Sequence, residues 1–396
     1  MMEKVELIRV FDVPKYADPY LFKHDNTSLY DDVMATYFGQ NYGQSNFVSS
    51  ALSSIGYSSI DVVANYKHAQ ITWAKEHGIS FYLDNWYIDI LISQINKYTP
   101  SVLFLVGWQF DNKFISHLKA HCTSVLKYVA WFGESLPDMA CYSEYNLILT
   151  CDPSHLISLE SYTVPIKHVN HAFSESLLIH ESKVKSRVSF LGSLKPGTQE
   201  HFDRARILSN LAQEPDFDMY LTISSASIYS VSLRGKLSKL AHEISEKIMS
   251  RKLIRHLLPG YRKVEFERMF NDYVRVLNKC NLGSLYGNNY LSRIGTSKAV
   301  LNIHSETQYA CNMRMFEVCG LGTTMICDKK KNMDDFFNVA EDVIVFKDVN
   351  ELQAIIKEIS AGSIDYLKVG ECGQKKILAN HTYKQRAHVY AECFFK

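Results

Sequence analysis

The sequence carries almost no net charge. Its 396 residues include 43 lysines and arginines against 42 aspartates and glutamates, which gives a formal net charge of +1. Proteins that bind nucleic acid through its phosphates usually carry an excess of basic residues. Short basic runs such as Lys329–Lys331 are more typical of a solvated surface. We therefore expect no nucleic-acid partner.

Long apolar runs are also missing. No segment approaches the ~20 apolar residues that a helix needs to cross a bilayer. The first residues, MMEKVELIRVFD, lack the apolar core of a signal peptide because Glu6 and Arg9 interrupt it. These absences predict a cytoplasmic protein, and they are compatible with a peripheral membrane contact.

The nine cysteines include no close pair of the C-x-x-C type. Cys311, Cys319 and Cys327 are evenly spaced, but the spacing matches no common zinc pattern and favours buried, reduced thiols. Asp334 and Asp335 are adjacent, and neighbours on a helix point about 100° apart, so they seldom bind one ion together. We predict no metal site and a reducing compartment.

The sequence does contain a repeated alternation of apolar strands and helical segments. In the first half, strands are predicted at residues 5–10, 60–64, 102–106, 125–132, 147–150 and 166–169. In the second half, strands are predicted at residues 188–192, 218–223, 299–301, 324–327 and 342–346. Continuous apolar strands separated by helices indicate an α/β fold with parallel sheets covered on both faces.

A chain of this length usually forms two domains. The charged stretch ESKVKS, between His180 and Arg187, interrupts the apolar pattern. We predict a first domain over residues 1–185, a second over 186–375 and a C-terminal helical segment, 376–396, within a helix expected from Gly370 to Phe394. The largely helical block at about 231–280 is predicted to be an insertion in the second domain.

The stretch from Ser297 to Asp328 predicts one βαβ crossover. After the apolar strand, Asn312 stands where a helix N-cap belongs, and Met313–Cys319 has the length of two helical turns. Gly320 occupies the place of a left-handed residue after a helix, and Gly322 leads into the next strand.

The start of this crossover helix suits an anion, because its free N–H groups and positive dipole end face the crevice. Arg314 and Glu317 are three residues apart and so share a helix face. A cation near phosphate and a carboxylate one turn deeper can hold a diphosphate and a ribose diol. The pattern therefore predicts a nucleotide-sugar site that includes Asn312, Gly320 and Gly322 as well.

Several sequence blocks resemble one known family. SKAVLNIH, NMRMFEVCGLGTTMICD, KKNMDDFF and GQKKILANHTYKQRA are similar to the carboxy-terminal signature of the CgeB-like bacterial glycosyltransferases. QITWAKEHG, VLFLVG, HAFSESLL and VSFLGS resemble further segments of that family, in the same order. The resemblance covers most of the chain, is most specific in NMRMFE and is weakest at residues 217–282.

The resemblance implies a group 1 transferase of the GT-B fold. That fold has two doubly wound Rossmann-like domains facing a central cleft, and its C-terminal helix commonly packs back on the first domain. Transfer in GT-B enzymes generally needs no metal, and no cofactor is implied because the nucleotide-sugar is a substrate.

The resemblance also implies a role for Glu317, which corresponds to the glutamate that binds the donor ribose in retaining group 1 transferases. A second glutamate is common eight residues earlier in those enzymes. Tyr309 stands at that position here, and Glu306 is out of register. This departure leaves open both the sugar contact and the retaining or inverting outcome.

Further donor contacts are expected from three places in the second domain. Gly192 and Ser193 follow an apolar strand, and a glycine there lets the backbone approach a diphosphate. Lys298 and His304 bracket the strand before the crossover helix, and His304 stands in a polar loop of the kind that carries function. A purely structural role is the alternative for each.

Two residues of the first domain are candidate catalytic bases. Glu134 follows the strand end Trp131-Phe132-Gly133 and could deprotonate an acceptor hydroxyl, although a glutamate that starts a helix before Pro137 is the alternative. His171 follows the last strand of this domain and is expected to face the hinge. The sequence does not choose between them.

The predicted function is transfer of a sugar from a nucleotide-sugar donor to a carbohydrate acceptor, free or on a lipid or protein, in bacterial surface glycan synthesis. The Tyr- and Asp-rich segment from Tyr16 to Tyr42 could stack on acceptor sugar rings, or it could simply pack on its own domain. An inactive GT-B scaffold, an epimerase of nucleotide sugars and a nucleic-acid glycosylating enzyme are the alternatives, the last disfavoured by the charge balance.

Overall fold

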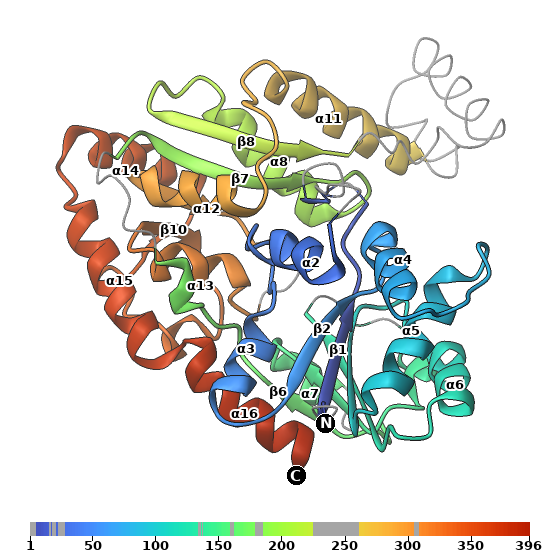
Figure 1. Cartoon of the computed structure of the whole chain (residues 1–396). Helices are drawn as coiled ribbons and strands as arrows, with labels where there is room; N and C mark the ends of the chain where they lie inside the picture. Colours follow the sequence, from blue (N-terminus) through green and yellow to red (C-terminus); the bar gives the residue numbers. More distant parts are fainter. Residues whose placement is uncertain are drawn as a thin grey trace.

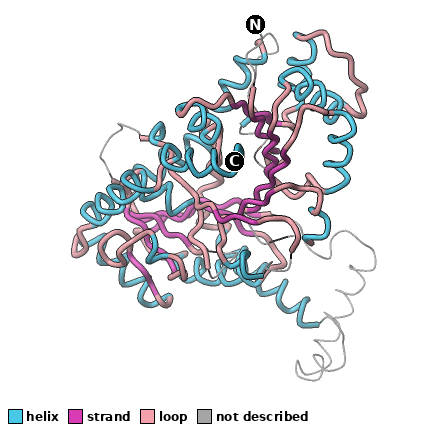
Figure 2. Tube along the Cα trace, turned by 90° about the horizontal axis from the view of Figure 1, so that it is seen from below, coloured by secondary structure: helices cyan, strands magenta, loops and turns pink. Residues whose placement is uncertain are grey.

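The computed structural model describes residues 5–15, 17, 21–22, 28–133, 136, 138–158, 162–178, 185–224, 261–304 and 309–396. Within these residues the chain forms two parallel sheets, each enclosed by helices (Figure 1). Figure 2 shows the two sheets as separate groups of strands with helices on either side. The predicted α/β architecture with two parallel sheets is confirmed.

The first sheet has six strands in the order β2-β1-β3-β4-β5-β6, with every adjacent pair parallel. Its strands are β1 (Leu7–Phe11), β2 (Ser59–Val63), β3 (Val102–Val106), β4 (Lys127–Phe132), β5 (Leu147–Thr150) and β6 (Ile166–His168). Its helices are α2 (Tyr30–Phe38), α3 (Phe47–Ser54), α4 (Lys67–Glu76), α5 (Trp86–Tyr98), α6 (Asn112–His121), α7 (Ser154–Ser158) and the 3₁₀ turns η1 (Met139–Tyr142) and η2 (Glu175–Leu177).

The second sheet has five parallel strands in the order β11-β10-β9-β7-β8. Its strands are β7 (Val188–Leu194), β8 (Phe217–Ile223), β9 (Ala299–Asn302), β10 (Thr324–Asp328) and β11 (Ile344–Phe346). The helices of this half of the chain are α8 (Gln199–Leu211), α11 (Tyr261–Leu277), α12 (Gly287–Thr296), α13 (Met313–Gly320), α14 (Val349–Ala361), α15 (Tyr366–Asn380), α16 (Tyr383–Phe395) and the 3₁₀ turn η3 (Met333–Asp335).

Every strand predicted from the sequence is present, with ends shifted by at most two residues. The helix predicted at the end of the chain is in fact two helices, α15 and α16. Thr382 starts α16 with a capping box in which Gln385 is the partner. Of the helical block predicted at 231–280, residues 231–260 lie outside the described residues, and α11 accounts for much of the rest.

The alternation of side chains along β3 shows how each face of the first sheet is covered. Leu103 and Leu105 belong to a buried cluster that includes side chains of α5 and α6. Val102 and Phe104 belong to a second cluster, which includes side chains of α3 and α16. The ring of Phe104 lies 4.9 Å from that of Phe394, between centroids. The last helix of the chain therefore covers a face of the first sheet.

The second cluster also contains residues of the second sheet, among them Val300 and Met325, so one apolar core is shared by both halves. Figure 1 shows α15 and α16 running along one side of the molecule from the second half to the first. Phe173 pairs with the backbone at the junction of α15 and α16. Its N–H donates to the His381 carbonyl (2.9 Å), and the Tyr383 N–H donates to the Phe173 carbonyl (2.9 Å). In the described part of the chain, no helix is both long and apolar enough to cross a membrane.

Gly320 lies within α13, and the left-handed conformation predicted for it belongs to Gly322, whose φ is 71°. A Cβ atom at Gly320 would lie 2.4 Å from the Phe173 ring, so the glycine lets this ring pack against the helix.

We expect Gly320→Ala to lower the free energy of unfolding by about 1–3 kcal/mol, because the added methyl overfills this contact. The measurement is urea unfolding followed by circular dichroism. Gly295→Ala is the matched control, because nothing lies within 4 Å of a Cβ at this helical glycine and alanine favours a helix. Equal unfolding midpoints for Gly320→Ala and the wild type would contradict the packing role.

Candidate functional site

A cavity of about 930 Å³ lies between the carboxyl ends of the two sheets. In the first sheet, residues that follow β1 and β3 line it. In the second, the start of α13 and the side chain of Tyr290 on α12 line it. Strands β2 and β3 flank β1, so the crevice beside the end of β1 is a topological switch point. Ligands of open parallel sheets bind at such points, which makes this cavity the candidate site.

The second-sheet side of the cavity centres on one hydroxyl group. The Tyr290 hydroxyl donates to Oε2 of Glu317 (3.0 Å) and accepts from Nε of Arg314 (3.3 Å). Burial raises the pKa of Glu317, and the hydrogen bond from Tyr290 and the charge of Arg314 oppose this rise. The Tyr290 hydroxyl thus links the guanidinium of Arg314 to the carboxylate of Glu317 through two hydrogen bonds.

Arg314 is also held from behind by amide groups. Its Nη1 donates to Oδ1 of Asn302 (3.0 Å), at the end of β9. Asn302 and Asn312 exchange two hydrogen bonds between their side chains, of 3.0 and 3.2 Å. Asn312 is the N-cap of α13 as predicted, but its side chain makes no capping hydrogen bond. Its amide is used instead to fix Asn302, and through it the guanidinium.

His304 and Asp328 continue this network into the second sheet. Nδ1 of His304 lies 2.9 Å from Oδ1 of Asp328, and Asn302 Nδ2 lies 3.3 Å from His304 Nε2. Lys330 Nζ lies 3.0 Å from Oδ2 of the same aspartate. Burial disfavours the charge on Asp328, but the hydrogen bonds from the ring and backbone N–H of His304 and the charge of Lys330 outweigh it and lower the pKa of Asp328 to about 2. Burial lowers the pKa of His304, which fits a neutral ring that donates to Asp328 and accepts from Asn302.

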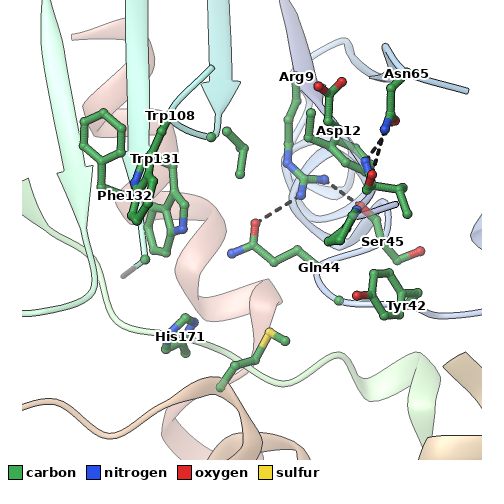
Figure 3. A pocket seen from close by; sticks show the side chains of 18 of the residues that line it. Arg9, Asp12, Tyr42, Gln44, Ser45, Asn65, Trp108, Trp131, Phe132 and His171 are labelled. Atoms are coloured by element: carbon green, nitrogen blue, oxygen red, sulfur yellow. Dashed lines mark hydrogen bonds between the residues drawn. The ribbon is translucent and has the colours of Figure 1, made fainter. Parts of the chain in front are cut away.

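The first-sheet side presents a carboxylate, that of Asp12, directly after β1 (Figure 3). The Tyr87 hydroxyl donates to its Oδ1 (3.0 Å). Burial raises the pKa of Asp12, while hydrogen bonds from Tyr87, Gln109 and the Asn65 backbone act in the opposite direction. A carboxyl group with a raised pKa in a cavity is a candidate proton acceptor.

A buried ion pair supports this side. Arg9 in β1 donates to Oδ1 of Asp61 in β2 (2.8 Å), and both side chains are 2% exposed. Its guanidinium also donates to the Ser45 carbonyl (2.5 Å) and to Oε1 of Gln44 (3.1 Å). Arg9 therefore fixes the loop before α3, which lines the cavity.

Aromatic rings form the opposite wall, where Trp108, Trp131 and Phe132 lie together across from Arg9 and Asp12 (Figure 3). His171 lies below them, with its ring centroid 6.0 Å from Trp131 and 6.1 Å from Phe316. Burial lowers the pKa of His171 to about 4, aided by the charge of Arg386 and by His168. This histidine is therefore neutral near pH 7.

The structure brings four of the residues predicted from the sequence to the cavity: His171, Asn312, Arg314 and Glu317. Two others lie behind it. His304 is buried in the asparagine network, and a Cβ at Gly192 would lie 3.5 Å from Nη2 of Arg314.

The remaining predicted residues are placed elsewhere. The Ser193 carbonyl accepts from Nη1 of Arg204 (3.0 Å). Lys298 precedes β9 at the amino end of the strand, opposite to the cavity, with its Nζ 6.0 Å from the Tyr366 ring centroid. Gly320 and Gly322 lie at the far end of α13 and pack against Phe173 and Gln374. Glu134 lies outside the described residues.

The segment from Tyr16 to Tyr42, which was predicted to contact the acceptor, lies only partly at the cavity. Tyr37 and Tyr42 line the cavity, Tyr37 being 2% exposed, whereas Tyr16 and Tyr20 lie outside the described residues. Tyr37 lies within 6.2 Å of the Tyr66 ring, so it also packs on its own domain.

Several residues of the site were not predicted, and Asp12, Asn302 and Tyr290 are the most informative of them. Asp12 ends the block VELIRVFD, so the rule that polar residues after buried strands reach the crevice could have found it. Asn302 is the last residue of β9 and follows the same rule. Tyr290 had no such signal, because it comes from a helix that the apolar pattern did not indicate.

Comparison with known proteins supplies independent observations. Residues 242–392, less than half of the chain, match a family model described as glycosyl transferase-like. No curated protein matches the sequence significantly.

Solved structures match over nearly the whole chain. A glycosyltransferase from Rickettsia africae is 12% identical, with 98% of this chain and 97% of that chain covered and a TM-score of 0.54. HepE of Anabaena, solved in complex with UDP and glucose, is 10% identical, with 98% and 99% covered and a TM-score of 0.52. A sucrose-phosphate synthase from Thermosynechococcus elongatus is also 10% identical, with 98% of each chain covered and a TM-score of 0.52. The chain has the GT-B fold.

The GT-B fold agrees with a cavity formed by the carboxyl ends of two separate parallel sheets. At this level of identity the likeness shows the fold alone. Within the described ranges of this GT-B chain, no group of three or more His, Cys, Asp or Glu side chains is arranged to hold a metal ion.

Proposed function

We propose that the protein is a glycosyltransferase that moves a sugar from a nucleotide-sugar to a carbohydrate acceptor or glycoconjugate, without a metal ion. The observation that carries this proposal is the cluster of Arg314, Tyr290 and Glu317 at the start of α13, inside the cavity between the sheets. The match of residues 242–392 to the glycosyl transferase-like family supports it.

The donor would bind on the second-sheet side. Its diphosphate would lie near Arg314 and the N-terminus of α13, where a cation and free N–H groups stabilise negative charge. The ribose hydroxyls would donate to Glu317, which has Oε1 free of the Tyr290 hydrogen bond. HepE of Anabaena, with UDP and glucose bound, suggests uridine nucleotides as the first probes.

The acceptor would bind on the first-sheet side, with a sugar ring against Trp108 and a hydroxyl near Asp12. As that oxygen bonds to the anomeric carbon, its proton would pass to Asp12 and the bond to the departing diphosphate would break. Burial favours Asp12 over His171 as the base. A buried carboxylate becomes neutral on taking a proton, whereas a buried imidazole becomes charged.

The finer assignments belong to the same proposal. The sequence blocks quoted above suggest the CgeB-like subfamily and a surface glycan on a lipid or protein carrier as the product. The scattered cysteines favour action in the cytoplasm. A peripheral membrane contact would suit a lipid-linked acceptor.

The proposal is tested by incubating the purified chain with a panel of nucleotide sugars, including UDP-glucose, and following the released nucleotide diphosphate and the sugar by mass spectrometry. We expect slow hydrolysis of at least one donor, and faster turnover when glycan extracts are added. Binding of nucleotides without any turnover would instead indicate an inactive GT-B scaffold. Interconversion of two nucleotide sugars would indicate an epimerase.

A further inference from the structure

A loop of the first half contacts the start of α12 in the second half. This docking loop comprises residues 39–45, between α2 and α3. Asn41 Nδ2 donates to Oδ1 of Asn288 (2.8 Å), and Asn288 Nδ2 donates to the Gly39 carbonyl (2.7 Å). The ring centroids of Tyr42 and Tyr286 lie 6.2 Å apart. The contact therefore spans the boundary between the halves and borders the cavity that Tyr42 lines.

The backbone at this contact is shaped for close approach. Gly287 has a φ of 55°, and a Cβ there would lie 2.5 Å from the Gln40 carbonyl oxygen. A side chain at Gly287 would thus be strained and would push the docking loop away. This glycine allows the first residue of α12 to lie directly on the loop.

The docking loop has a fixed shape of its own. Asn41, Gly43 and Ser45 all have positive φ, with values of 53°, 58° and 40°. The buried Arg9 holds its end through the Ser45 carbonyl. Because the docking loop is fixed to β1 in this way, a movement of the first sheet moves the loop and changes its contact with α12.

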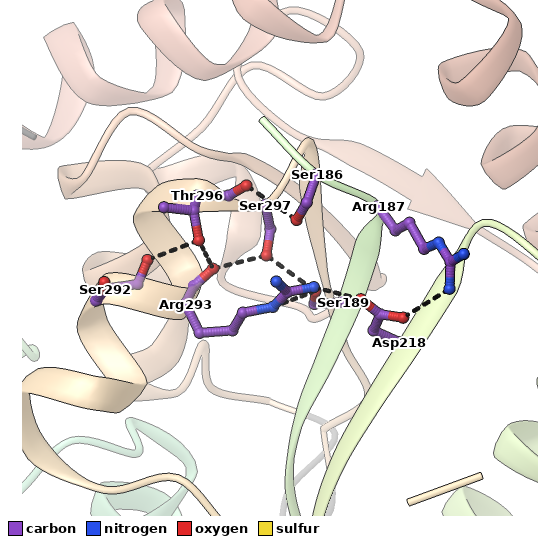
Figure 4. Close-up of polar contacts among 8 residues, drawn as sticks. All are labelled: Ser186, Arg187, Ser189, Asp218, Ser292, Arg293, Thr296 and Ser297. Atoms are coloured by element: carbon purple, nitrogen blue, oxygen red, sulfur yellow. Dashed lines mark hydrogen bonds and ion pairs between the residues drawn. The ribbon is translucent and has the colours of Figure 1, made fainter. Parts of the chain in front are cut away.

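The other contacts of α12 reach the donor side and the second sheet. Less than one turn after Asn288, Tyr290 holds Arg314 and Glu317. Near the end of the helix, Arg293 forms an ion pair with Asp218 and donates to Ser189 (Figure 4). Ser297 completes this network by donating to Ser189 (2.9 Å). The far end of α12 is therefore fixed to the second sheet, and its first turn lies between the docking loop and the donor residues.

We propose that Asn288 is a positioning residue: docking of loop 39–45 on the first turn of α12 sets the Tyr290 hydroxyl and thereby aligns Arg314 and Glu317 for the nucleotide diphosphate. This inference rests on the proposed function for its ligand. The domain contact itself is made by described residues and is independent of that ligand. Donor affinity is then coupled to the relative placement of the two halves.

The test replaces Asn288 with aspartate, which keeps the shape of the side chain but loses the N–H donor and places a charge against the Gly39 carbonyl. An acidic residue in the first helical turn is otherwise favourable, so the helix should form normally. Asn289→Asp is the matched control. It adds the same charge in the same turn at an exposed residue that makes none of the loop contacts described above. Asn41→Gly removes the partner amide and still suits the positive φ.

By calorimetry with UDP, ADP and GDP as probes, Asn288→Asp and Asn41→Gly should each weaken the best-bound nucleotide about 5- to 10-fold. Asn289→Asp should stay within about twofold of the wild type, as expected for a surface substitution. Tyr290→Phe should weaken binding at least as much as Asn288→Asp. A double variant that carries Asn288→Asp and Asn41→Gly should lose less nucleotide affinity than the product of the two single losses, because both substitutions act through one helix.

Hydrogen exchange without nucleotide separates this inference from the proposed function. Amides of residues 287–296 should exchange about threefold faster or more in Asn288→Asp and Asn41→Gly than in Asn289→Asp. If exchange rises but the wild type binds no nucleotide, the positioning contact stands and the proposed donor is wrong. If the wild type binds nucleotide and both loop variants bind it equally well, the positioning role is overturned. Unchanged exchange in both loop variants would overturn it as well.

Discussion

Replacing Asp12 with asparagine should lower the turnover of sugar transfer by about 100-fold or more, while the affinity for nucleotide diphosphates stays within about twofold. Asparagine has nearly the shape of aspartate and can still accept from the Tyr87 hydroxyl, but it cannot take up a proton. The cavity places Asp12 on the first-sheet side, and the donor residues Arg314 and Glu317 belong to the second. A loss confined to turnover is therefore the expected sign of a base.

The pH dependence gives a second readout for Asp12. Because a base must be ionised to act, turnover should rise with pH through the raised pKa of this carboxyl group. Tyr87→Phe removes a hydrogen bond that stabilises the ionised form, so the acid limb should move to higher pH. His171→Gln serves as the comparison, because the other candidate base lies in the same cavity.

The measurements are hydrolysis and transfer of the donor found in the nucleotide-sugar panel, with nucleotide affinity determined in parallel. Undiminished turnover in Asp12→Asn, with a loss in His171→Gln, would assign the base to the histidine. A parallel loss of nucleotide affinity in Asp12→Asn would show that the aspartate is needed for the shape of the cavity.

The sequence predicted the sheets well because strand positions depend on local apolar pattern. Residues such as Val102–Val106 are buried on both faces and cannot be mistaken for an amphipathic helix. The end of the chain was harder, because the junction at Thr382 is made by a capping box and by pairing with Phe173, which is distant in sequence. The apolar pattern around Thr382 depends only on neighbouring residues and therefore cannot indicate a contact with Phe173.

The site was predicted in part for a similar reason. Arg314 and Glu317 share a helix face through their spacing alone, so their proximity could be inferred. Lys298 was expected beside them, but a residue that precedes a parallel strand lies at the edge opposite to the one that binds ligands. Tyr290 joins Arg314 to Glu317 from another helix, and only the packing of α12 on α13 brings it there.

Glu317→Gln should weaken the binding of nucleotide diphosphates by about 10- to 100-fold at pH 8, because hydrogen bonds to a charged acceptor are worth roughly twice those to a neutral one. Glutamine keeps an oxygen for the Tyr290 hydroxyl, so the cluster should retain its shape. The residue is 8% exposed and lies in a helix whose other buried side chains are apolar, and the neutral amide should not destabilise the fold.

The effect should shrink as the pH falls, for a reason that lies in the burial of the carboxyl group. Burial raises the pKa of Glu317 above 4.5, so the carboxylate takes up a proton at a higher pH than an exposed glutamate does. Once protonated, it resembles glutamine in charge. The ratio of wild-type to Glu317→Gln affinity should therefore be largest at pH 8 and should fall toward one as the pH is lowered through the raised pKa of this carboxyl group.

Calorimetry at several pH values measures this ratio, which cancels the titration of the nucleotide phosphates and of Asp12 and His171 in the same cavity. Burial raises the pKa of both Tyr290 and Tyr383, and the charge of Glu317 raises both further, so neither phenol changes charge over this range. A ratio that stays near one at every pH would mean that Glu317 makes no contact with the donor. A large ratio that does not change with pH would mean that shape, and not charge, is what the glutamate supplies.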